Sequence, residues 1–299
     1  MKRTAYCKIN LTLEILGTRR NDGFHDLKSI MHKIPLGDEI ELVAGQGSGK
    51  ITLFCDSDVC DVCDNLAYKA AKLYIERYKQ NTGKNADVEI KLTKITPTGA
   101  GLGGGSADAA CVLDMLEREL GGVSDKETLE MAEKLGSDVP FCLERYTSAV
   151  CTGRGEMCQN TARLPSGVCI VVAKPAQSIN TKGIYAEYDK AFGDDYSKSK
   201  TEEMQKALEN GNLSEIAKHI MNDFEYVCIP RLPEIGTIKK EMIKLGAVSS
   251  SMSGSGSAVF GLFDDENKCK ECCKALKEQG CKDVFCFCDE DFKKMYNAE

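Results

Sequence analysis

The sequence lacks tryptophan, an excess of positive charge and any long apolar run. Lys and Arg number 39 against 46 for Asp and Glu, which gives a formal net charge of -7. A protein that binds duplex nucleic acid normally shows a basic excess or a basic stripe, so the charge argues against that partner. The strongest apolar run, at 167–173, is far shorter than the roughly 20 residues that span a bilayer. Residues 1–16 lack the apolar segment of a signal peptide, and we expect a cytoplasmic protein with no membrane partner.

Cysteine is abundant, with 16 residues in a chain of 299. Without an export signal, reduced thiols are the favoured interpretation. Two pairs have CxxC spacing, Cys60/Cys63 and Cys269/Cys272. A zinc ribbon needs its second pair about 15–20 residues after the first, whereas roughly two hundred residues separate these two. We therefore expect buried or incidental thiols rather than a metal site.

Apolar and polar residues alternate over 5–15, which predicts a half-buried strand. Lys8 and Asn10 fall on its polar face, about 7 Å apart along the strand. Elsewhere the pattern predicts a loop at 249–257, a polar loop within 186–212 and a domain boundary near 155–165. Further strands are expected at 40–43, 51–55, 88–92, 148–173 (two strands), 258–263 and 283–288. Helices are expected from 66 to near 83 and at 109–120, 124–136, 201–209, 213–220, 232–245 and 266–279.

The most informative segment is 97–108, with five glycines in the seven positions from 99 to 105. A turn needs one or two glycines, so this run indicates a backbone that approaches a ligand closely. A strand before it and a helix after it place the amides of Gly103 to Ala107 at a helix N-terminus, which favours phosphate. The segment contains the pattern GxGxxG of a Rossmann loop. A Rossmann fold, however, needs a strand after the helix that follows this loop, and the element predicted there is another helix. A Walker A lysine and the protein-kinase motifs are absent from the sequence.

Three segments, in the same order, resemble the motifs of the GHMP kinase superfamily. AYCKINL at 5–11 is similar to its N-terminal strand motif, 97–107 to its glycine-rich motif, and 251–257 to its C-terminal glycine loop. KINL at 8–11, RNDGFH at 20–25 and GSDVP at 136–140 resemble the branch that acts on a cytidyl diphosphate sugar alcohol. The chain departs from the usual pattern at Ala107, Asp108 and Phe24, where Ser, Asn and Tyr are common.

The resemblance implies an α+β, two-domain GHMP kinase fold. Its N-terminal domain, at 1–160, would be like domain 2 of ribosomal protein S5, and its C-terminal domain, at 161–299, ferredoxin-like α/β. The implied activity is ATP-dependent phosphorylation of the 2-hydroxyl of a cytidyl diphosphate derivative of methylerythritol, in the non-mevalonate route to isoprenoid precursors. ATP and Mg²⁺ are the implied cofactors, and the implied assembly is a monomer or homodimer.

The resemblance also assigns roles to residues. Asp138 removes the proton of the acceptor hydroxyl, and Lys8, 130 positions earlier, keeps that carboxylate ionised if the two side chains meet. Ser106 is a candidate Mg²⁺ ligand, and Asn65 faces the adenine or caps its helix. The implied ATP-binding residues are Pro97, Thr98, Gly99, Ala100, Gly101, Leu102, Gly103, Gly104, Gly105, Ser106, Ala107 and Asn65.

The cytosine end of the substrate is assigned to Asn10, Phe24, His25 and Tyr185. Neutral His and Asn side chains supply donors and acceptors for a base edge. Phe24 and Tyr185 would stack on the ring, at about 1–3 kcal/mol per base. Two alternatives stay open: another GHMP small-molecule kinase of the homoserine or mevalonate type, whose acceptor has no base to stack, and a catalytically silent nucleotide-binding relative.

Overall fold

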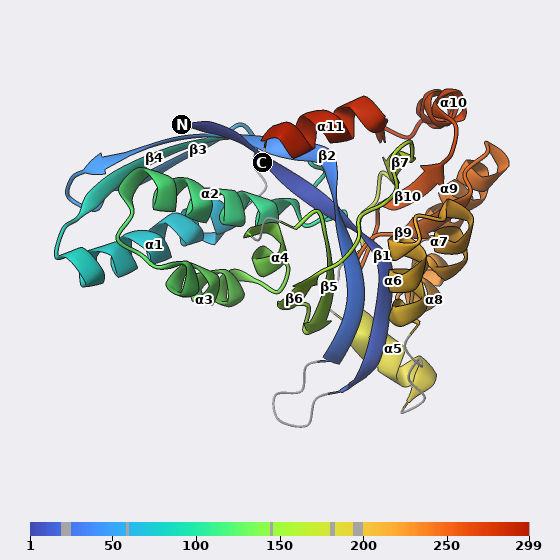
Figure 1. Cartoon of the computed structure of the whole chain (residues 1–299), viewed down its shortest axis with the longest axis horizontal. Coiled ribbons are helices and arrows are strands. Elements are labelled where there is room, and N and C mark those ends of the chain that lie inside the picture. Colours follow the sequence, from blue (N-terminus) through green and yellow to red (C-terminus); the bar gives the residue numbers. More distant parts are fainter. Residues whose placement is uncertain (19–24, 58–59, 144–145, 180–182, 194–199, 299) are drawn as a thin grey trace. The chain divides into compact units, whose positions relative to one another are not determined.

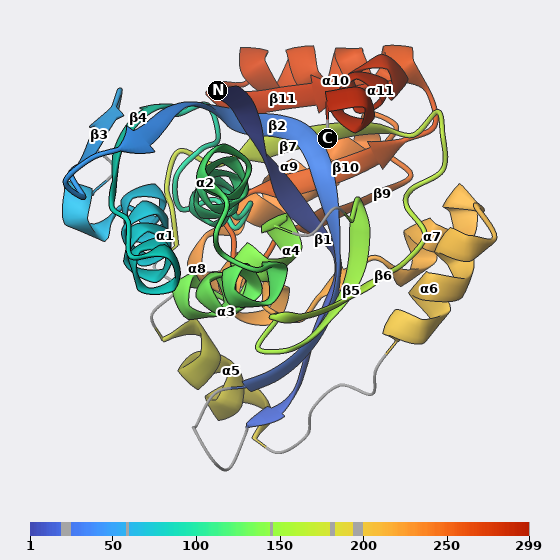
Figure 2. The same ribbon diagram turned by 60° about the vertical axis from the view of Figure 1, so that its left-hand side comes forward.

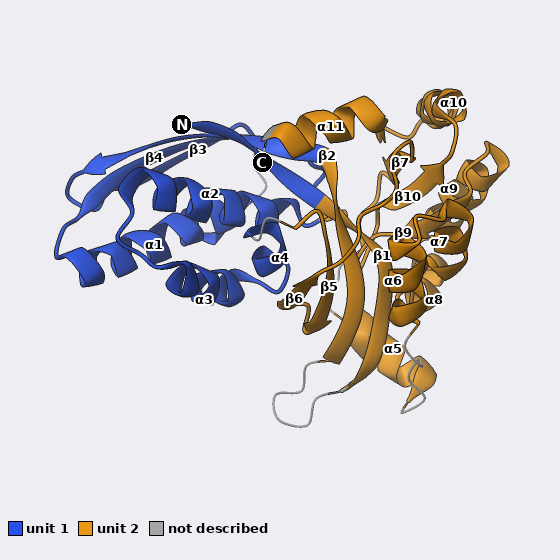
Figure 3. Ribbon diagram, in the orientation of Figure 1, with its two compact units in different colours: residues 1–7, 36–98, 103–145 blue, residues 8–35, 99–102, 146–299 orange. Residues whose placement is uncertain are grey.

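The computed structural model describes residues 1–18, 25–57, 60–143, 146–179, 183–193 and 200–298 (Figure 1). The chain forms two compact units (Figure 3). Unit 1 comprises residues 1–7, 36–98 and 103–145, and unit 2 comprises residues 8–35, 99–102 and 146–299. These units group residues that lie close together in space, and each consists of several separate segments of the chain. They therefore do not test the expected family domains at 1–160 and 161–299, which stay a prediction.

Unit 1 packs helices on strands. Strand β4 (Ala86–Thr93) pairs antiparallel with β2 (His25–Gln46) and parallel with β3 (Ile51–Cys55). Side chains of β4 alternate between buried and exposed, as its sequence predicts. The start of β1 (Lys2–Thr18) also belongs here. The helical elements are η1 (Val62–Asp64), α1 (Leu66–Thr82), α2 (Gly104–Leu120), α3 (Asp125–Leu135) and α4 (Val139–Leu143).

Local sequence signals fix the ends of these helices. The Asn65 side chain accepts a hydrogen bond from the Ala67 amide (2.9 Å) at the start of α1, which ends at Gly83 with φ +71°. Ser124 and Glu127 form the expected capping box of α3. Helix α2 begins at Gly104, five residues before the predicted start, because Gly103 adopts the left-handed region and serves as its N-cap.

Unit 2 contains an antiparallel four-stranded sheet in the order β11-β7-β10-β9, whose strands lie side by side in Figure 2. Helix α10 (Glu266–Glu278) contacts β7 and β11, and α9 (Pro233–Lys244) contacts β9 and β10. These four strands are β7 (Cys169–Lys174), β9 (Ser249–Met252), β10 (Val259–Phe263) and β11 (Asp283–Phe287). The other elements are β5 (Ser148–Gly153), β6 (Met157–Asn160), β8 (Met221–Asn222), α5 (Ile184–Phe192), α6 (Thr201–Glu209), α7 (Leu213–His219), α8 (Glu225–Arg231) and α11 (Asp289–Ala298).

The prediction of a half-buried first strand is wrong. Its polar face is buried as well, since Lys8, Asn10, Thr12 and Glu14 are each at most 2% exposed. Within unit 2, the start of α6 covers this face: Thr201 Oγ1 donates to Glu14 Oε2 (2.5 Å), and the Lys200 amide donates to Glu14 Oε1. Alternation in one segment cannot reveal that a helix far along the chain covers the polar side.

The loop expected before the helix at 201–209 lies largely outside the described residues. The stretch before it is helix α5, whose buried Ile184 and Tyr188 lie four residues apart on one face. Two further expectations for unit 2 need correction. Residues 249–252 form β9 rather than a loop, because they pair with β10. Residues 148–174 hold three strands, not two. In the described part of the chain, no helix is long and apolar enough to cross a membrane.

Candidate active site

The glycine-rich loop has the backbone that its composition predicts. Gly99, Gly101 and Gly103 have φ values of +64°, +74° and +72°, a region that side chains with a Cβ rarely adopt. Helix α2 follows immediately at Gly104. The first-turn amides of a helix have no partner within it, and together with the helix dipole they favour an anion.

A second loop, at 253–257, packs against the start of the first one within unit 2. A Cβ on Gly101 would lie 2.1 Å from the Ser253 carbonyl oxygen, so only glycine fits there. Ser253 Oγ donates a hydrogen bond to the Gly101 carbonyl (3.0 Å), and the Ala258 amide donates to the Ala100 carbonyl (2.9 Å). Two of the motifs singled out in the sequence are therefore in direct contact.

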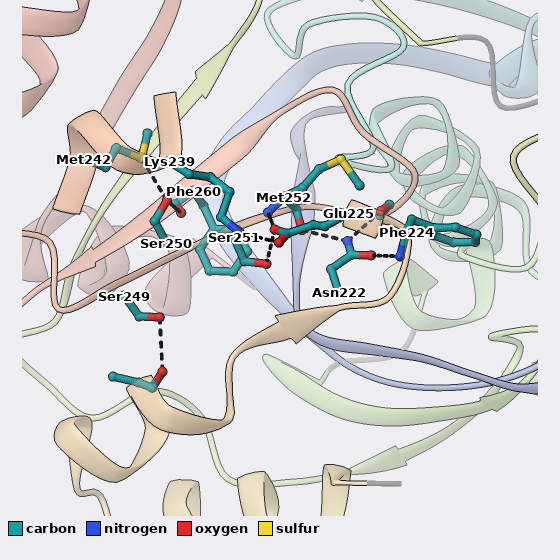
Figure 4. Close-up of polar contacts among 12 residues, drawn as sticks. Asn222, Phe224, Glu225, Lys239, Met242, Ser249, Ser250, Ser251, Met252 and Phe260 are labelled. Carbon is teal, nitrogen blue, oxygen red and sulfur yellow. Dashed lines mark hydrogen bonds and ion pairs between the residues drawn. The ribbon is translucent and has the colours of Figure 1, made fainter. Parts of the chain in front are cut away.

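Residues that the sequence analysis missed hold this second loop in place (Figure 4). Asn222 Nδ2 donates to the carbonyls of Met252 (2.8 Å) and Gly254 (2.7 Å). Glu225 Oε1 accepts from Ser251 Oγ (2.8 Å) and the Met252 amide (2.7 Å), and Lys239 forms an ion pair with Glu225 (Figure 4). No motif marks these three residues, because their role arises from contacts between distant segments.

Lys8 lies against the glycine-rich loop. Its side chain is buried, and Nζ donates to Asn10 Oδ1 (2.8 Å) and to the Gly101 carbonyl (3.0 Å). The Lys8 amide also donates to the Leu102 carbonyl (2.9 Å). Asn10 Nδ2 in turn donates to Ser29 Oγ (2.8 Å), a residue that the sequence analysis did not select. The shared face expected for Lys8 and Asn10 thus carries a hydrogen-bonded chain that ends at the loop.

Asp138 belongs to unit 1, in the turn between α3 and α4. Its side chain is half-buried, and its carbonyl accepts a hydrogen bond from the Cys142 amide (3.2 Å), within the first turn of α4. Lys8 belongs to unit 2, and the meeting of the two side chains stays a prediction.

The residues expected at the cytosine end come together in unit 2. The rings of His25 and Tyr185 have centroids 4.7 Å apart and planes at 30°, which leaves no room for a base between these two rings. His25 Nε2 lies 2.7 Å from Asp189 Oδ1, a carboxylate that no sequence signal indicated. Tyr185 also packs edge-on against Phe224. Phe24 lies outside the described residues, so the expected stacking of Phe24 and Tyr185 stays a prediction.

Asp108, one of the departures from the family pattern, lies in a buried charged cluster of unit 1. Lys94 Nζ is 2.7 Å from Asp108 Oδ2 and also pairs with Asp38. Asp38 Oδ1 accepts the amides of Ile95 (2.6 Å) and Thr96 (2.7 Å), just before the glycine-rich loop. Burial raises the pKa of Asp108 to about 7, against the opposing effect of the Lys94 charge.

Asn65 caps α1, as described above, and its expected contact with adenine stays a prediction. Ser106 lies in the first turn of α2, where a hydroxyl fits a metal ion carried by a phosphate group. In the described part of the chain, the one cluster of three or more metal-binding side chains consists of cysteines, which do not suit Mg²⁺. The Ser106 hydroxyl fits a magnesium ligand, and magnesium binding there stays a prediction.

A glycine-rich loop in contact with a buried lysine is the kind of site that an ATP-dependent small-molecule kinase uses. The chain matches the family models of the GHMP kinases N terminal domain over residues 65–145 and of the GHMP kinases C terminal domain over residues 204–281. It belongs to the GHMP kinase family, which confirms the expected α+β fold class.

Similar proteins extend over nearly the whole chain. The 4-diphosphocytidyl-2-C-methyl-D-erythritol kinase of Caldanaerobacter subterraneus is 40% identical over 266 residues, 88% of each protein. The protein of that name from Clostridium botulinum is 38% identical over 292 residues, 95% of this chain and 98% of that protein. A crystal structure of 4-(cytidine 5'-diphospho)-2C-methyl-D-erythritol kinase aligns with a TM-score of 0.77 at 33% identity, over 96% of this chain and 98% of that one. A homoserine kinase from Cytophaga hutchinsonii, at 20% identity and a TM-score of 0.67, shares the fold.

Proposed function

We propose that this chain transfers the γ-phosphoryl group of ATP to the 2-hydroxyl of 4-diphosphocytidyl-2-C-methyl-D-erythritol, in the non-mevalonate route to isoprenoid precursors. The observation that carries the proposal is the near full-length similarity, at 38–40% identity, to kinases named for that substrate. The direct contact of Lys8 with the glycine-rich loop supports it independently. We also propose a cytoplasmic enzyme that works as a monomer or homodimer.

Phosphoryl transfer asks a protein mainly for positioning and charge stabilisation. In the proposed reaction, the acceptor oxygen bonds to the γ-phosphorus as the bond to the β–γ bridging oxygen breaks, and ADP leaves. The amides at the start of α2 bind the phosphate oxygens. Ser106 would hold a Mg²⁺ ion, which would supply positive charge to neutralise the phosphate groups of ATP.

The acceptor proton passes to the Asp138 carboxylate in this proposal. Lys8 supplies a positive charge that lowers the pKa of the hydroxyl, and its bonds to Asn10 and Gly101 hold the ammonium group in one orientation. Asn10, His25 and Tyr185 recognise the cytidyl group, with Asp189 orienting the His25 ring.

The acceptor is tested by measuring ADP release with the cytidyl substrate, homoserine and mevalonate. We expect turnover with the cytidyl substrate alone. Preference for homoserine or mevalonate would assign the chain to another branch of the family, and ATP binding without turnover on any acceptor would indicate a silent relative.

The base is tested by Asp138→Asn, with Glu133→Gln, an exposed change on the preceding helix, as the control. We expect kcat to fall about 10²–10⁴-fold in Asp138→Asn while ATP affinity stays nearly constant, because the amide cannot accept the proton. The Glu133→Gln variant should keep normal turnover. Near-normal kcat in Asp138→Asn would remove the residue from the role of base.

A further inference from the structure

Three cysteines that the proposed reaction does not use converge inside unit 2. Cys169 begins β7, Cys269 lies in the first turns of α10, and Cys288 directly follows β11. Their Sγ atoms all lie within 4.8 Å of one another. The residues are 2%, 0% and 7% exposed. Residues separated by as many as 119 positions in the chain thus bring three thiols close together.

The spacing of the three sulfur atoms suits a single metal ion. Zinc binds thiolate sulfur at about 2.3 Å in tetrahedral geometry, which places neighbouring sulfurs about 3.8 Å apart. Each Cys sulfur therefore needs to shift by about 1 Å or less to reach that geometry. In the described part of the chain, no His, Asp or Glu joins the cluster, so the ligand set is soft throughout. Thiolates select soft or borderline cations such as Zn²⁺ over Mg²⁺ or Ca²⁺.

Burial alone does not account for the cluster. Cys272, on the same helix as Cys269, is equally buried in the core of unit 2 but does not belong to the group of three. The CxxC spacing of Cys269 and Cys272 is therefore misleading, because the sulfur partners of Cys269 come from β7 and the end of β11. The cluster is defined by the spatial proximity of three sulfur atoms and not by their spacing in the sequence.

We propose that Cys169, Cys269 and Cys288 bind one thiophilic divalent cation of the zinc–cadmium type. Each thiol releases its proton to solvent as its sulfur–metal bond forms, so the step involves no oxidant or reductant. A water molecule completes the coordination from the side of Cys288, the most exposed of the three. The ion would link β7, α10 and β11, and its role would be to stabilise unit 2 rather than to act on substrate.

The test uses the full chain with the exposed Cys60 and Cys63 replaced by serine, so that this surface pair cannot bind metal. The reduced protein, in a phosphine reductant, is titrated with Cd²⁺ while sulfur-to-cadmium charge-transfer absorption is recorded. Zn²⁺ is then added in competition. We expect the parent protein to hold one tight equivalent that Zn²⁺ displaces, and its thermal unfolding midpoint to rise on binding.

Variants in this background decide the assignment. Cys269→Ser and Cys288→Ser should each lose that tight equivalent, while Cys272→Ser, matched in helix and burial, should keep it. Far-UV circular dichroism identifies the variants that remain folded, and Cys288→Ser, nearest the surface, serves if Cys269→Ser does not fold. The proposal is overturned if Cys288→Ser and Cys269→Ser retain the tight equivalent, or if Cys272→Ser loses it to the same extent.

Discussion

Replacing Asp108 by Asn should remove a loss of unfolding free energy that unit 1 suffers as the pH rises. The buried cluster contains one cation, Lys94, and two carboxylates, Asp38 and Asp108. The net charge of this cluster is zero when one of the two carboxyl groups holds a proton. Because burial and Asp38 outweigh Lys94, the pKa of Asp108 rises from 3.8 to about 7. In Asp108→Asn, Lys94 and Asp38 remain as an ion pair with no net charge between pH 5 and pH 8.

The size of the effect follows from linkage. A carboxyl group with a raised pKa binds its proton more tightly in the folded chain, so this stabilisation is complete below pH 3.8 and is lost as pH rises through 7. A difference of about 3 pKa units corresponds to at most about 4 kcal/mol. Because the Asp108 carboxyl group is already ionised in the unfolded chain at pH 5, only about two pKa units of this difference are lost between pH 5 and pH 8. We therefore expect the wild type to lose about 1–3 kcal/mol relative to Asp108→Asn over that range.

Urea unfolding at the two pH values, followed by far-UV circular dichroism because tryptophan is absent, measures this difference. Asp87→Asn provides a contrast of opposite sign. Backbone hydrogen bonds from Lys50, Ser48 and Gly49 lower the pKa of Asp87, so its stabilisation is present above pH 3.8 and fades in acid. The deficit of Asp87→Asn should therefore be the same at pH 8 and pH 5, and should shrink only when unfolding is measured below pH 3.8. Parallel pH profiles for wild type and Asp108→Asn would refute the account of the buried cluster.

Two other substitutions examine the loop and the substrate end. Gly101→Ala should abolish binding of an ATP analogue, because its Cβ would overlap the Ser253 carbonyl, whereas Gly83→Ala, with a similar φ but open space, should cost only about 1 kcal/mol in a thermal melt. Unchanged nucleotide affinity in Gly101→Ala would show that ATP binding does not require the packing of Gly101 against Ser253. Asp189→Asn should raise KM for the cytidyl substrate several-fold and leave KM for ATP constant; equal changes in steady-state kinetics would contradict its role in orienting His25.

Local patterns predict local structure well in this chain. The five glycines indicate a loop with positive φ, and Ser124 with Glu127 indicates a capping box, because each signal acts within a few residues. The alternation around Lys8 likewise predicts which side chains share a face. The contact of Lys8 with Gly101 could not be predicted from local patterns, since the two residues are 93 positions apart.

Long-range contacts account for what could not be predicted. Asn222 and Glu225 support the second glycine loop, and Asp189 meets His25, 164 positions earlier. Nothing in the immediate sequence of these residues distinguishes them from ordinary helix-terminal or surface polar groups. Burial of the Glu14 face by the start of α6 was missed for the same reason.

The discontinuity of the compact units constrains the order in which they form during synthesis. All residues of unit 1 have been made once residue 145 is added, so its core is able to assemble on the ribosome. Unit 2 draws Leu13 and Ile15 from the start of the chain into a core completed by Cys288. Leu13 and Ile15 must therefore wait for the last elements before their packing is satisfied. A nascent chain halted near residue 160 would expose these two apolar side chains and the edge of β1 that later pairs with β8.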